Sequence, residues 1–175
     1  MLRILGRLPV VLIMAYLSVR YLASSDYSTL IDTANLALHE GGHLHFFYPL
    51  IAPLDPTGGF IHFLGGTFAQ LAFPAIFGVY FLRTGQYFAV SVMVFWLGQN
   101  CVDIAPYAGD ARARELPLIF ENGTHDWWYM LRRLDLLAFD KVIARAFYLS
   151  GALLFALALL LGTYTTFVDL ESDSG

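Results

Sequence analysis

The chain is poor in cysteine and in charged residues, and both shortages narrow what it can be. Its 175 residues include one cysteine, Cys101, so neither an internal disulfide nor a cysteine-rich metal site can form. Charged residues make up 14% of the sequence, whereas an average soluble domain has about 25%. The 10 Lys and Arg residues are scattered and form no basic stretch suited to nucleic acid, which is therefore not an expected partner.

Apolar residues are correspondingly abundant. They make up 58% of the chain, and the mean hydropathy is +0.61, so the sequence is too apolar for an ordinary soluble domain. We predict an all-α fold, a polytopic bundle of about five transmembrane helices in a single integral membrane domain over residues 1–175, with membrane lipids as partners. The predicted spans are residues 8–23, 28–49, 60–82, 86–105 and 142–167, and a cytoplasmic loop with a short amphipathic helix occupies residues 107–140.

Positive residues are unequally divided between the two ends of these predicted helices. With a cytoplasmic N-terminus, eight lie inside and two outside, as the positive-inside rule requires. The inner eight are Arg3, Arg7, Arg112, Arg114, Arg132, Arg133, Lys141 and Arg145, and the outer two are Arg20 and Arg83. This predicts a protein of the bacterial inner membrane with its N-terminus in the cytoplasm and its C-terminus outside. Residues 8–23 also have the form of a signal peptide, but Arg20 near their end argues against cleavage.

Residues 39–43, His-Glu-Gly-Gly-His, form the most informative motif. On an α-helix, His39 and His43 lie one turn apart on the same face, with Glu40 beside them. Imidazole nitrogens bind zinc, and a neighbouring carboxylate can take a proton from water at the metal. The motif therefore predicts that His39 and His43 bind a metal and that Glu40 is the catalytic base. A hydrogen-bonding network that only fixes helix packing is less favoured, because ionisable groups in a membrane helix are costly.

A catalytic zinc centre commonly has three protein ligands and one open position. The candidates for the third ligand are His125, Asp103, Asp110 and Asp55. We rank His125 first, because the adjacent Asp126 could support it, and Asp103 second, because a carboxylate in a neighbouring membrane helix needs a reason to be there. One zinc ion is expected, although iron or a two-metal site stays open. Around the metal, or at a second metal, we expect Asp110, Asn100, Asp126 and Tyr107.

A membrane helix with this motif, followed by Gly65-Gly66 and by a later helix bearing Asn100 and Asp103, resembles the site-2 protease family of intramembrane zinc metalloproteases. The resemblance implies that the two histidines bind zinc, that the glutamate is the general base, and that an aspartate on a later helix, best matched by Asp103, is the third ligand. It covers about residues 30–110. The fourth span lacks the family's asparagine-proline and leucine-aspartate-glycine motif. The whole pattern is also similar to a group of small bacterial membrane proteins of unassigned activity.

These observations predict a membrane-embedded zinc-dependent hydrolase. The expected activity is that of a peptidase acting on a membrane protein or peptide, in the membrane or at its cytoplasmic edge. One alternative is a non-hydrolytic metal-binding membrane protein, such as an iron or di-metal oxidoreductase. Another is a structural or transport component in which the buried polar groups form a network or an ion path.

Overall fold

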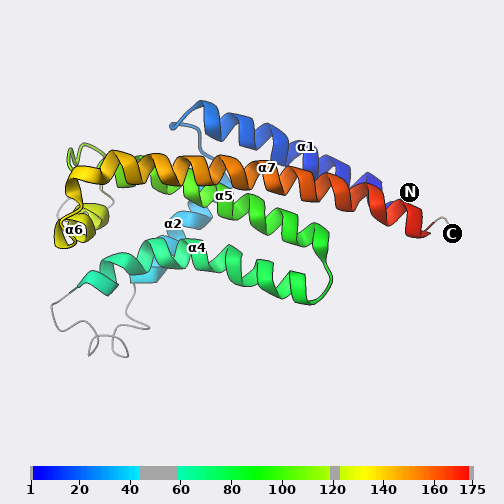
Figure 1. The fold of residues 1–175 in the computed structure, drawn as a ribbon, viewed down its shortest axis with the longest axis horizontal. Coiled ribbons are helices and arrows are strands. Elements are labelled where there is room, and N and C mark those ends of the chain that lie inside the picture. The colour runs from blue at the N-terminus through cyan, green and yellow to red at the C-terminus, as the bar shows by residue number, and fades with distance from the viewer. Residues whose placement is uncertain (1, 44–58, 119–122, 174–175) are drawn as a thin grey trace. The chain divides into compact units, whose positions relative to one another are not determined.

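The computed structural model describes residues 2–43, 59–118 and 123–173, and the regular structure in these ranges is helical (Figure 1). The elements are α1 (Leu2–Ala23), α2 (Leu30–His43), α4 (Phe60–Arg83), α5 (Tyr87–Gly109), α6 (Asp126–Arg133), the short 3-10 helix η2 (Leu137–Phe139) and α7 (Asp140–Asp173). The prediction of an all-α fold is confirmed.

Among the described residues, four helices are long and apolar enough to cross a membrane, judged by length and composition: Gly6–Ala23, Phe60–Arg83, Tyr87–Gly109 and Leu137–Val168. They correspond to four of the five predicted spans. The fifth, residues 28–49, is described only as far as α2, and α2 has 14 residues. A helix of that length measures about 21 Å, which is shorter than the roughly 30 Å hydrocarbon core of a bilayer. The predicted residues 44–49 lie outside the described ranges.

Unit 1, one of two compact units, combines α1 with the adjoining parts of α4, α5 and α7. Its core contains Phe155, whose ring lies 5.1 Å from that of Phe95 on α5 and 6.4 Å from that of Tyr21 on α1. The Nη1 atom of Arg7 donates a hydrogen bond to the carbonyl of Thr165 at 3.0 Å. The first turns of α1 and the last turns of α7 therefore lie at the same end of unit 1 (Figure 1). Five crossings, as predicted, would put the two ends of the chain at opposite ends.

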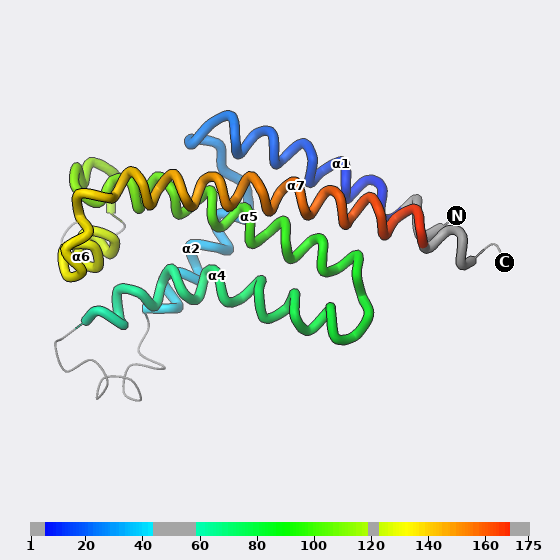
Figure 2. The backbone as a smooth tube through the Cα atoms, in the orientation of Figure 1, coloured from blue at the N-terminus to red at the C-terminus, as the bar shows by residue number. Residues whose placement is uncertain are grey.

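Within unit 1, α4 and α5 form an antiparallel pair joined by a tight turn (Figure 2). Gly85 has a φ of 71°, the left-handed conformation that commonly ends a helix and that glycine adopts without strain. The backbone N–H of the next residue, Gln86, donates to the carbonyl of Phe81 at 2.9 Å, which closes the last turn of α4. The start of α5 lies near the start of α1, since the Arg7 guanidinium is 5.1 Å from the centre of the Phe88 ring.

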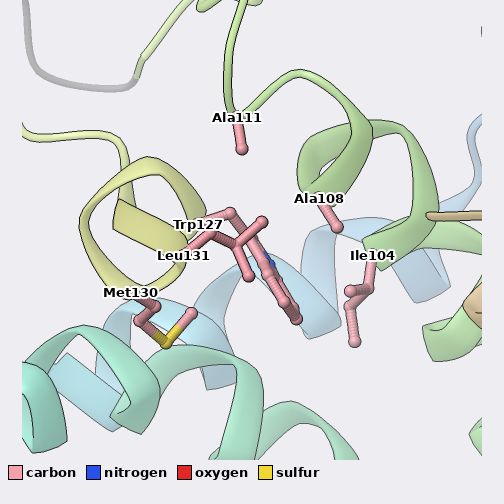
Figure 3. Close-up of a cluster of buried hydrophobic side chains, with 6 residues drawn as sticks. All are labelled: Ile104, Ala108, Ala111, Trp127, Met130 and Leu131. Atoms are coloured by element: carbon pink, nitrogen blue, oxygen red, sulfur yellow. The ribbon is translucent and has the colours of Figure 1, made fainter. Parts of the chain in front are cut away.

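Unit 2 combines α2, α6 and η2 with the remaining parts of α4, α5 and α7. Its core is a cluster of buried apolar side chains (Figure 3): Ile104, Ala108, Ala111, Trp127, Met130 and Leu131. Trp127 is 8% exposed and belongs to this core. It therefore packs α6 against α5, whereas Trp128 and Tyr129 are only half-buried.

Helices α2 and α4 touch backbone to backbone in unit 2. A Cβ atom on Gly42 would overlap the carbonyl oxygen of Gly65, and a Cβ on Gly65 would overlap the carbonyl oxygen of Gly42. Only a pair of glycines permits this contact, which sets the motif of α2 directly against α4. The start of α2 is fixed by a capping box, in which Thr29 Oγ1 accepts from the backbone N–H of Ile31 at 3.1 Å and Asp32 Oδ2 accepts from Thr29.

Candidate metal centre

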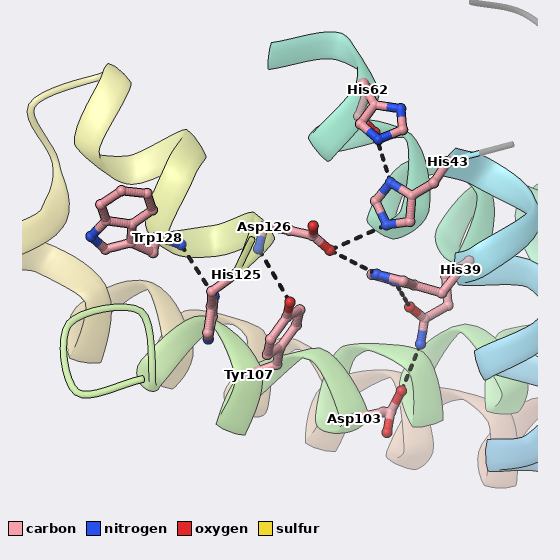
Figure 4. A network of polar contacts seen from close by, with 9 residues as sticks. His39, His43, His62, Asp103, Tyr107, His125, Asp126 and Trp128 are labelled. Carbon is pink, nitrogen blue, oxygen red and sulfur yellow. Dashed lines mark hydrogen bonds and ion pairs between the residues drawn. The ribbon is translucent and has the colours of Figure 1, made fainter. Parts of the chain in front are cut away.

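Two imidazoles and one carboxylate converge in unit 2 (Figure 4). His39 and His43 lie one turn apart on α2, and Asp126 is the first residue of α6. The Oδ2 atom of Asp126 is 2.9 Å from Nε2 of His39 and 3.2 Å from Nε2 of His43. Donors bound tetrahedrally to zinc lie about 3.3 Å apart, because each is about 2.0–2.1 Å from the metal. One donor atom from each of the three side chains lies within 4.8 Å of the other two, so the group could hold a single metal ion.

A hydrogen bond made by the Nδ1 atom of His43 leaves the Nε2 atom of the same ring available to bind a metal. This Nδ1 lies 2.8 Å from the backbone carbonyl oxygen of His62 on α4. A carbonyl oxygen only accepts, so Nδ1 carries the proton and donates it. In a neutral ring Nε2 then has a free lone pair, and that atom faces Asp126. This is the arrangement usual for histidines that bind metals.

His39 is oriented in the same way, through a side-chain amide. Its Nδ1 lies 3.2 Å from Oε1 of Gln70, and Nε2 of Gln70 donates to Oδ2 of Asp103 at 2.6 Å (Figure 4). An ionised carboxylate only accepts, so the Gln70 nitrogen faces Asp103 and its oxygen faces the imidazole. Nδ1 of His39 is therefore the donor, and its Nε2 is available to a metal. Gln70 is buried, at 3% exposure, and so holds the ring in a fixed environment.

The electrostatics of the group favour a cation at its centre. Burial acts to raise the pKa of Asp126, but the hydrogen bonds and charges of His39 and His43 outweigh it and hold this pKa below its ordinary value. Asp126 is thus ionised at neutral pH. Because both Nδ1 atoms are protonated, the two Nε2 atoms can face this carboxylate favourably only with a proton or a metal ion between them.

The backbone of α4 forms one wall of the group at Gly66. A Cβ atom at this position would overlap Nε2 of His43 and lie 2.7 Å from Nε2 of His39. A side chain here would occupy the space between the two Nε2 atoms and the backbone of α4. Glycine at this position thus serves the site, whereas Gly42 and Gly65 serve the contact between helices.

A cavity of about 810 Å³ adjoins the three side chains. Glu40 lines it together with His39, His43 and Asp126, as a base acting at the metal would require. Leu36, Phe63 and Ile104 are among the apolar residues on its walls. The cavity has the size and composition of a small-ligand site, mostly apolar with a few converging polar groups.

His125, ranked first from the sequence as the third ligand, has a different position. It is the N-cap of α6, where its Nδ1 accepts the backbone N–H of Trp128 at 3.3 Å. Its Nε2 lies 3.4 Å from Oδ2 of Asp110. Burial lowers the pKa of His125, so the ring is neutral, and Nδ1 accepts, so Nε2 carries the proton. The structure thus brings the neighbour of His125, Asp126, to the two histidines.

The other residues expected around the site have supporting or separate positions. Asp103 contacts Gln70, and Tyr107 accepts the backbone N–H of Asp126 at 3.2 Å. Asp110 accepts the backbone N–H groups of Glu115 and Leu116, which fixes the turn after α5. Asn100 belongs to unit 1, where its amide donates to the carbonyl of Trp96 at 3.1 Å. Asp55 lies outside the described residues.

The sequence favours His125 over Asp126 as the third ligand and does not assign Gln70 or Gly66 to the site, whereas the structure places Asp126 beside His39 and His43. Asp126 was expected only as a supporting residue, although it stands next to the leading candidate. The sequence does contain one signal for these two residues, because Gln70 is a polar residue in an otherwise apolar helix and follows Gly66 by four positions. On a helix these two positions share a face, and polar groups inside membrane helices usually have a partner.

Comparison of the chain with protein-family models, with curated proteins and with solved structures finds no match. The resemblance to the site-2 protease family thus stands on the motif residues alone. Function has to be argued from the geometry of the site.

Proposed function

We propose that the protein is a membrane-embedded zinc-dependent hydrolase that cleaves peptide bonds. The observation that supports this most directly is the convergence of His39, His43 and Asp126 beside a cavity that Glu40 also lines. Two imidazoles and one carboxylate, with a glutamate next to the first histidine, are the groups that hydrolytic zinc sites use. His39, His43 and Asp126 would hold the ion, and Gln70 and the His62 carbonyl would orient the rings.

The residues of the chain have distinct tasks in this reaction. Zinc, when bound, would supply Lewis acidity and lower the pKa of a water molecule to about 7. Glu40 accepts a proton from the attacking water as the water oxygen bonds to the carbonyl carbon. It then gives that proton to the leaving nitrogen as the C–N bond breaks. The apolar wall formed by Leu36, Phe63 and Ile104 takes the apolar side chains of the substrate and excludes bulk water.

We further propose four crossings, by α1, α4, α5 and α7, in a bacterial inner membrane. Seven of the ten Lys and Arg residues then fall on the side of the connections 24–59 and 110–136: Arg20, Arg112, Arg114, Arg132, Arg133, Lys141 and Arg145. Three, namely Arg3, Arg7 and Arg83, fall on the side of the termini. The positive-inside rule then favours a cytoplasmic site with both termini outside. The metal site is cytoplasmic in this four-crossing topology and in the five-crossing topology predicted from the sequence. The N-terminus is outside in the first and cytoplasmic in the second.

Elemental analysis of the full chain purified in detergent tests the metal site. We expect about one zinc per chain in the wild type and little in His43→Ala or Asp126→Ala, since each removes a ligand. Asp26→Ala is a matched control, because it removes an exposed aspartate outside the group. A wild type without metal, or an Asp126→Ala variant that keeps it, would contradict the proposed ligands.

Hydrolysis is tested separately by Glu40→Gln, which keeps the size of the side chain and removes its basicity. The variant should retain zinc and lose about 10²–10⁴-fold in the cleavage rate of fluorogenic apolar peptides, the usual contribution of a general base. Full activity with zinc bound would exclude Glu40 as the base. If the zinc-loaded wild type cleaves no peptide, the site belongs to the non-hydrolytic metal-binding alternative.

A two-metal oxidoreductase would need more ligands than the structure brings together. Within the described ranges, His39, His43 and Asp126 are the group of His, Cys, Asp and Glu side chains spaced to hold a metal. Asp103 and Asp110, which could complete a second site, accept hydrogen bonds from Gln70 and from the backbone of residues 115–116. A single hydrolytic ion therefore fits this donor set better.

A further inference from the structure

We propose that Arg114, Trp128 and Arg132 form a binding site for the phosphate of an anionic phospholipid. The Cζ atoms of Arg114 and Arg132 each lie 5.0 Å from the centre of the Trp128 ring. Arg114 follows α5, whereas Arg132 is in the last turn of α6, so the indole gathers two guanidinium groups from separate segments of unit 2. Cation–π attraction to the indole stabilises each of them there.

The indole attracts both guanidinium groups but does not neutralise their positive charges, and an anion that accepts hydrogen bonds from them would lower the repulsion between these charges. Arg112 has its own carboxylate, since its Nε donates to Asp140 Oδ2 at 2.8 Å. In the part of the chain that the structure describes, neither Arg114 nor Arg132 forms an ion pair of this kind. The planar guanidinium donates two parallel N–H groups, which match two oxygens of a phosphate.

The turn that carries Arg114 is held rigidly. Arg114 has a φ of 54°, a left-handed conformation that is unfavourable for a residue other than glycine. Its backbone N–H donates to the carbonyl of Asp110 at 2.7 Å, and the Asp110 carboxylate accepts the N–H groups of Glu115 and Leu116, each at 3.0 Å. The guanidinium is therefore presented to Trp128 by an ordered turn.

Apolar side chains next to the two arginines indicate a lipid as the source of the phosphate. Leu116 is 41% exposed and Leu134 is 53% exposed, and each lies two residues from Arg114 or Arg132 along the chain. A free phosphate would use only the guanidinium groups, whereas a phospholipid also brings acyl chains to the leucines. This assignment uses the proposed membrane placement, in which the loop after α5 lies at the level of the headgroups. It does not depend on the metal site.

The charges around the site favour a lipid with a single negative charge. Arg133, whose guanidinium donates to the Tyr129 hydroxyl at 3.2 Å, follows Arg132 directly in the sequence. Glu115 follows Arg114, and Asp135 lies three residues after Arg132; both are exposed. Three arginines beside two carboxylates leave a net charge of about +1 at neutral pH. A phosphodiester such as phosphatidylglycerol matches this balance, whereas zwitterionic phosphatidylethanolamine does not.

Native mass spectrometry of the full chain, released from detergent with added lipid, tests the site. The wild type should bind one phosphatidylglycerol more tightly than it binds phosphatidylethanolamine. The double variant Arg114→Gln/Arg132→Gln should bind phosphatidylglycerol about tenfold more weakly, because two charges near the headgroup are lost. Arg20→Gln/Arg83→Gln is the matched control, since it removes two positive charges elsewhere and should leave the affinity unchanged.

Substitution of the indole separates this site from a diffuse positive surface. Trp128→Leu changes no charge, yet it should weaken phosphatidylglycerol binding, while Trp128→Phe keeps an aromatic face and most of the affinity. Equal binding of the two lipids, or wild-type binding by the double variant or by Trp128→Leu, would overturn the proposal. Competition by millimolar inorganic phosphate would instead identify a free-phosphate site and remove the lipid assignment. Unchanged zinc content in each variant would separate these results from the metal centre.

Discussion

The hydrogen bonds made by the Nδ1 atoms determine the orientation and the tautomer of the His39 and His43 rings. Both Nδ1 atoms donate to oxygens of α4, so both Nε2 atoms face Asp126. A histidine pair without these acceptors could rotate or change tautomer, and the ligand geometry would be lost.

Gln70→Leu tests this dependence without removing a ligand. It deletes the acceptor of the His39 Nδ1 proton and should lower zinc affinity about 10–100-fold, the usual effect of losing a group that orients a ligand. Competition with a chromogenic chelator measures the change. Gln86→Leu is the matched control, because Gln86 is exposed in the turn between α4 and α5. If Gln70→Leu binds zinc like the wild type, Gln70 does not orient His39.

Gly66→Ala should abolish zinc binding while the protein stays folded. The added methyl group would meet the ends of two histidine side chains, which can swing away from each other, so helix packing is preserved and the ligand set is not. Gly41→Ala is the control, since a Cβ at that position has no atom within 4 Å. Elemental analysis and circular dichroism together report the outcome; retention of zinc by Gly66→Ala would mean that the ion binds elsewhere.

The pair His125 and Asp126 shows what sequence alone could not decide. His39, Glu40 and His43 were predictable, because their relative positions follow from helix geometry within five residues. Which of two adjacent residues reaches the ligands depends on where α6 begins. His125 is the N-cap, a position at which Ser, Thr, Asp and Asn are preferred. N-cap preferences therefore favour Asp126 as the cap, whereas in the structure His125 is the cap and Asp126 is the first residue of the helix.

At the scale of elements, the crossing of α2 and α4 depends on one pair of glycines. Gly42→Ala should destabilise the fold by about 1–3 kcal/mol, as overpacking does, because its methyl group would overlap backbone that cannot move aside. Gly41→Ala, one residue earlier, should be neutral or stabilising by up to about 1 kcal/mol, since alanine favours helix more than glycine. Unfolding in detergent, followed by circular dichroism, compares the two. Equal stability of both variants would contradict the close contact.

The start of α6 offers a test of whether His125 is a cap or a ligand. Asparagine can accept the N–H of Trp128 as His125 does, so His125→Asn should keep both the helix and the zinc. His125→Ala should cost about 1 kcal/mol of stability through loss of the cap. Loss of zinc from a well-folded His125→Asn variant would instead restore the sequence-based interpretation of His125 as a ligand.

At the scale of the whole molecule, hydropathy identified the four long helices and could not settle α2. An apolar helix of 14 residues resembles the beginning of a membrane span in sequence, because composition does not reveal where a helix stops. Charge counting could not correct this, since five crossings give eight positive residues against two and four crossings give seven against three. Both satisfy the positive-inside rule. The contact between Arg7 and Thr165 supports the proposed four crossings, because it places the first turns of α1 and the later turns of α7 at the same end of unit 1.

Single cysteines in a Cys101→Ser background can decide the number of crossings. Gln86→Cys and Glu115→Cys fall on opposite sides of the membrane with either four or five crossings, so they calibrate labelling by an impermeant maleimide in intact cells. Ser25→Cys, in the exposed connection between α1 and α2, is diagnostic. With four crossings it should be protected together with Glu115→Cys; with five it should react like Gln86→Cys.

Protection of Ser25→Cys would mean that the chain enters and leaves α2 on the cytoplasmic side of the membrane. Substrate would then have to reach Glu40 from the cytoplasm or from within the bilayer. Reaction of Ser25→Cys from outside would show that residues 28–49 cross the membrane.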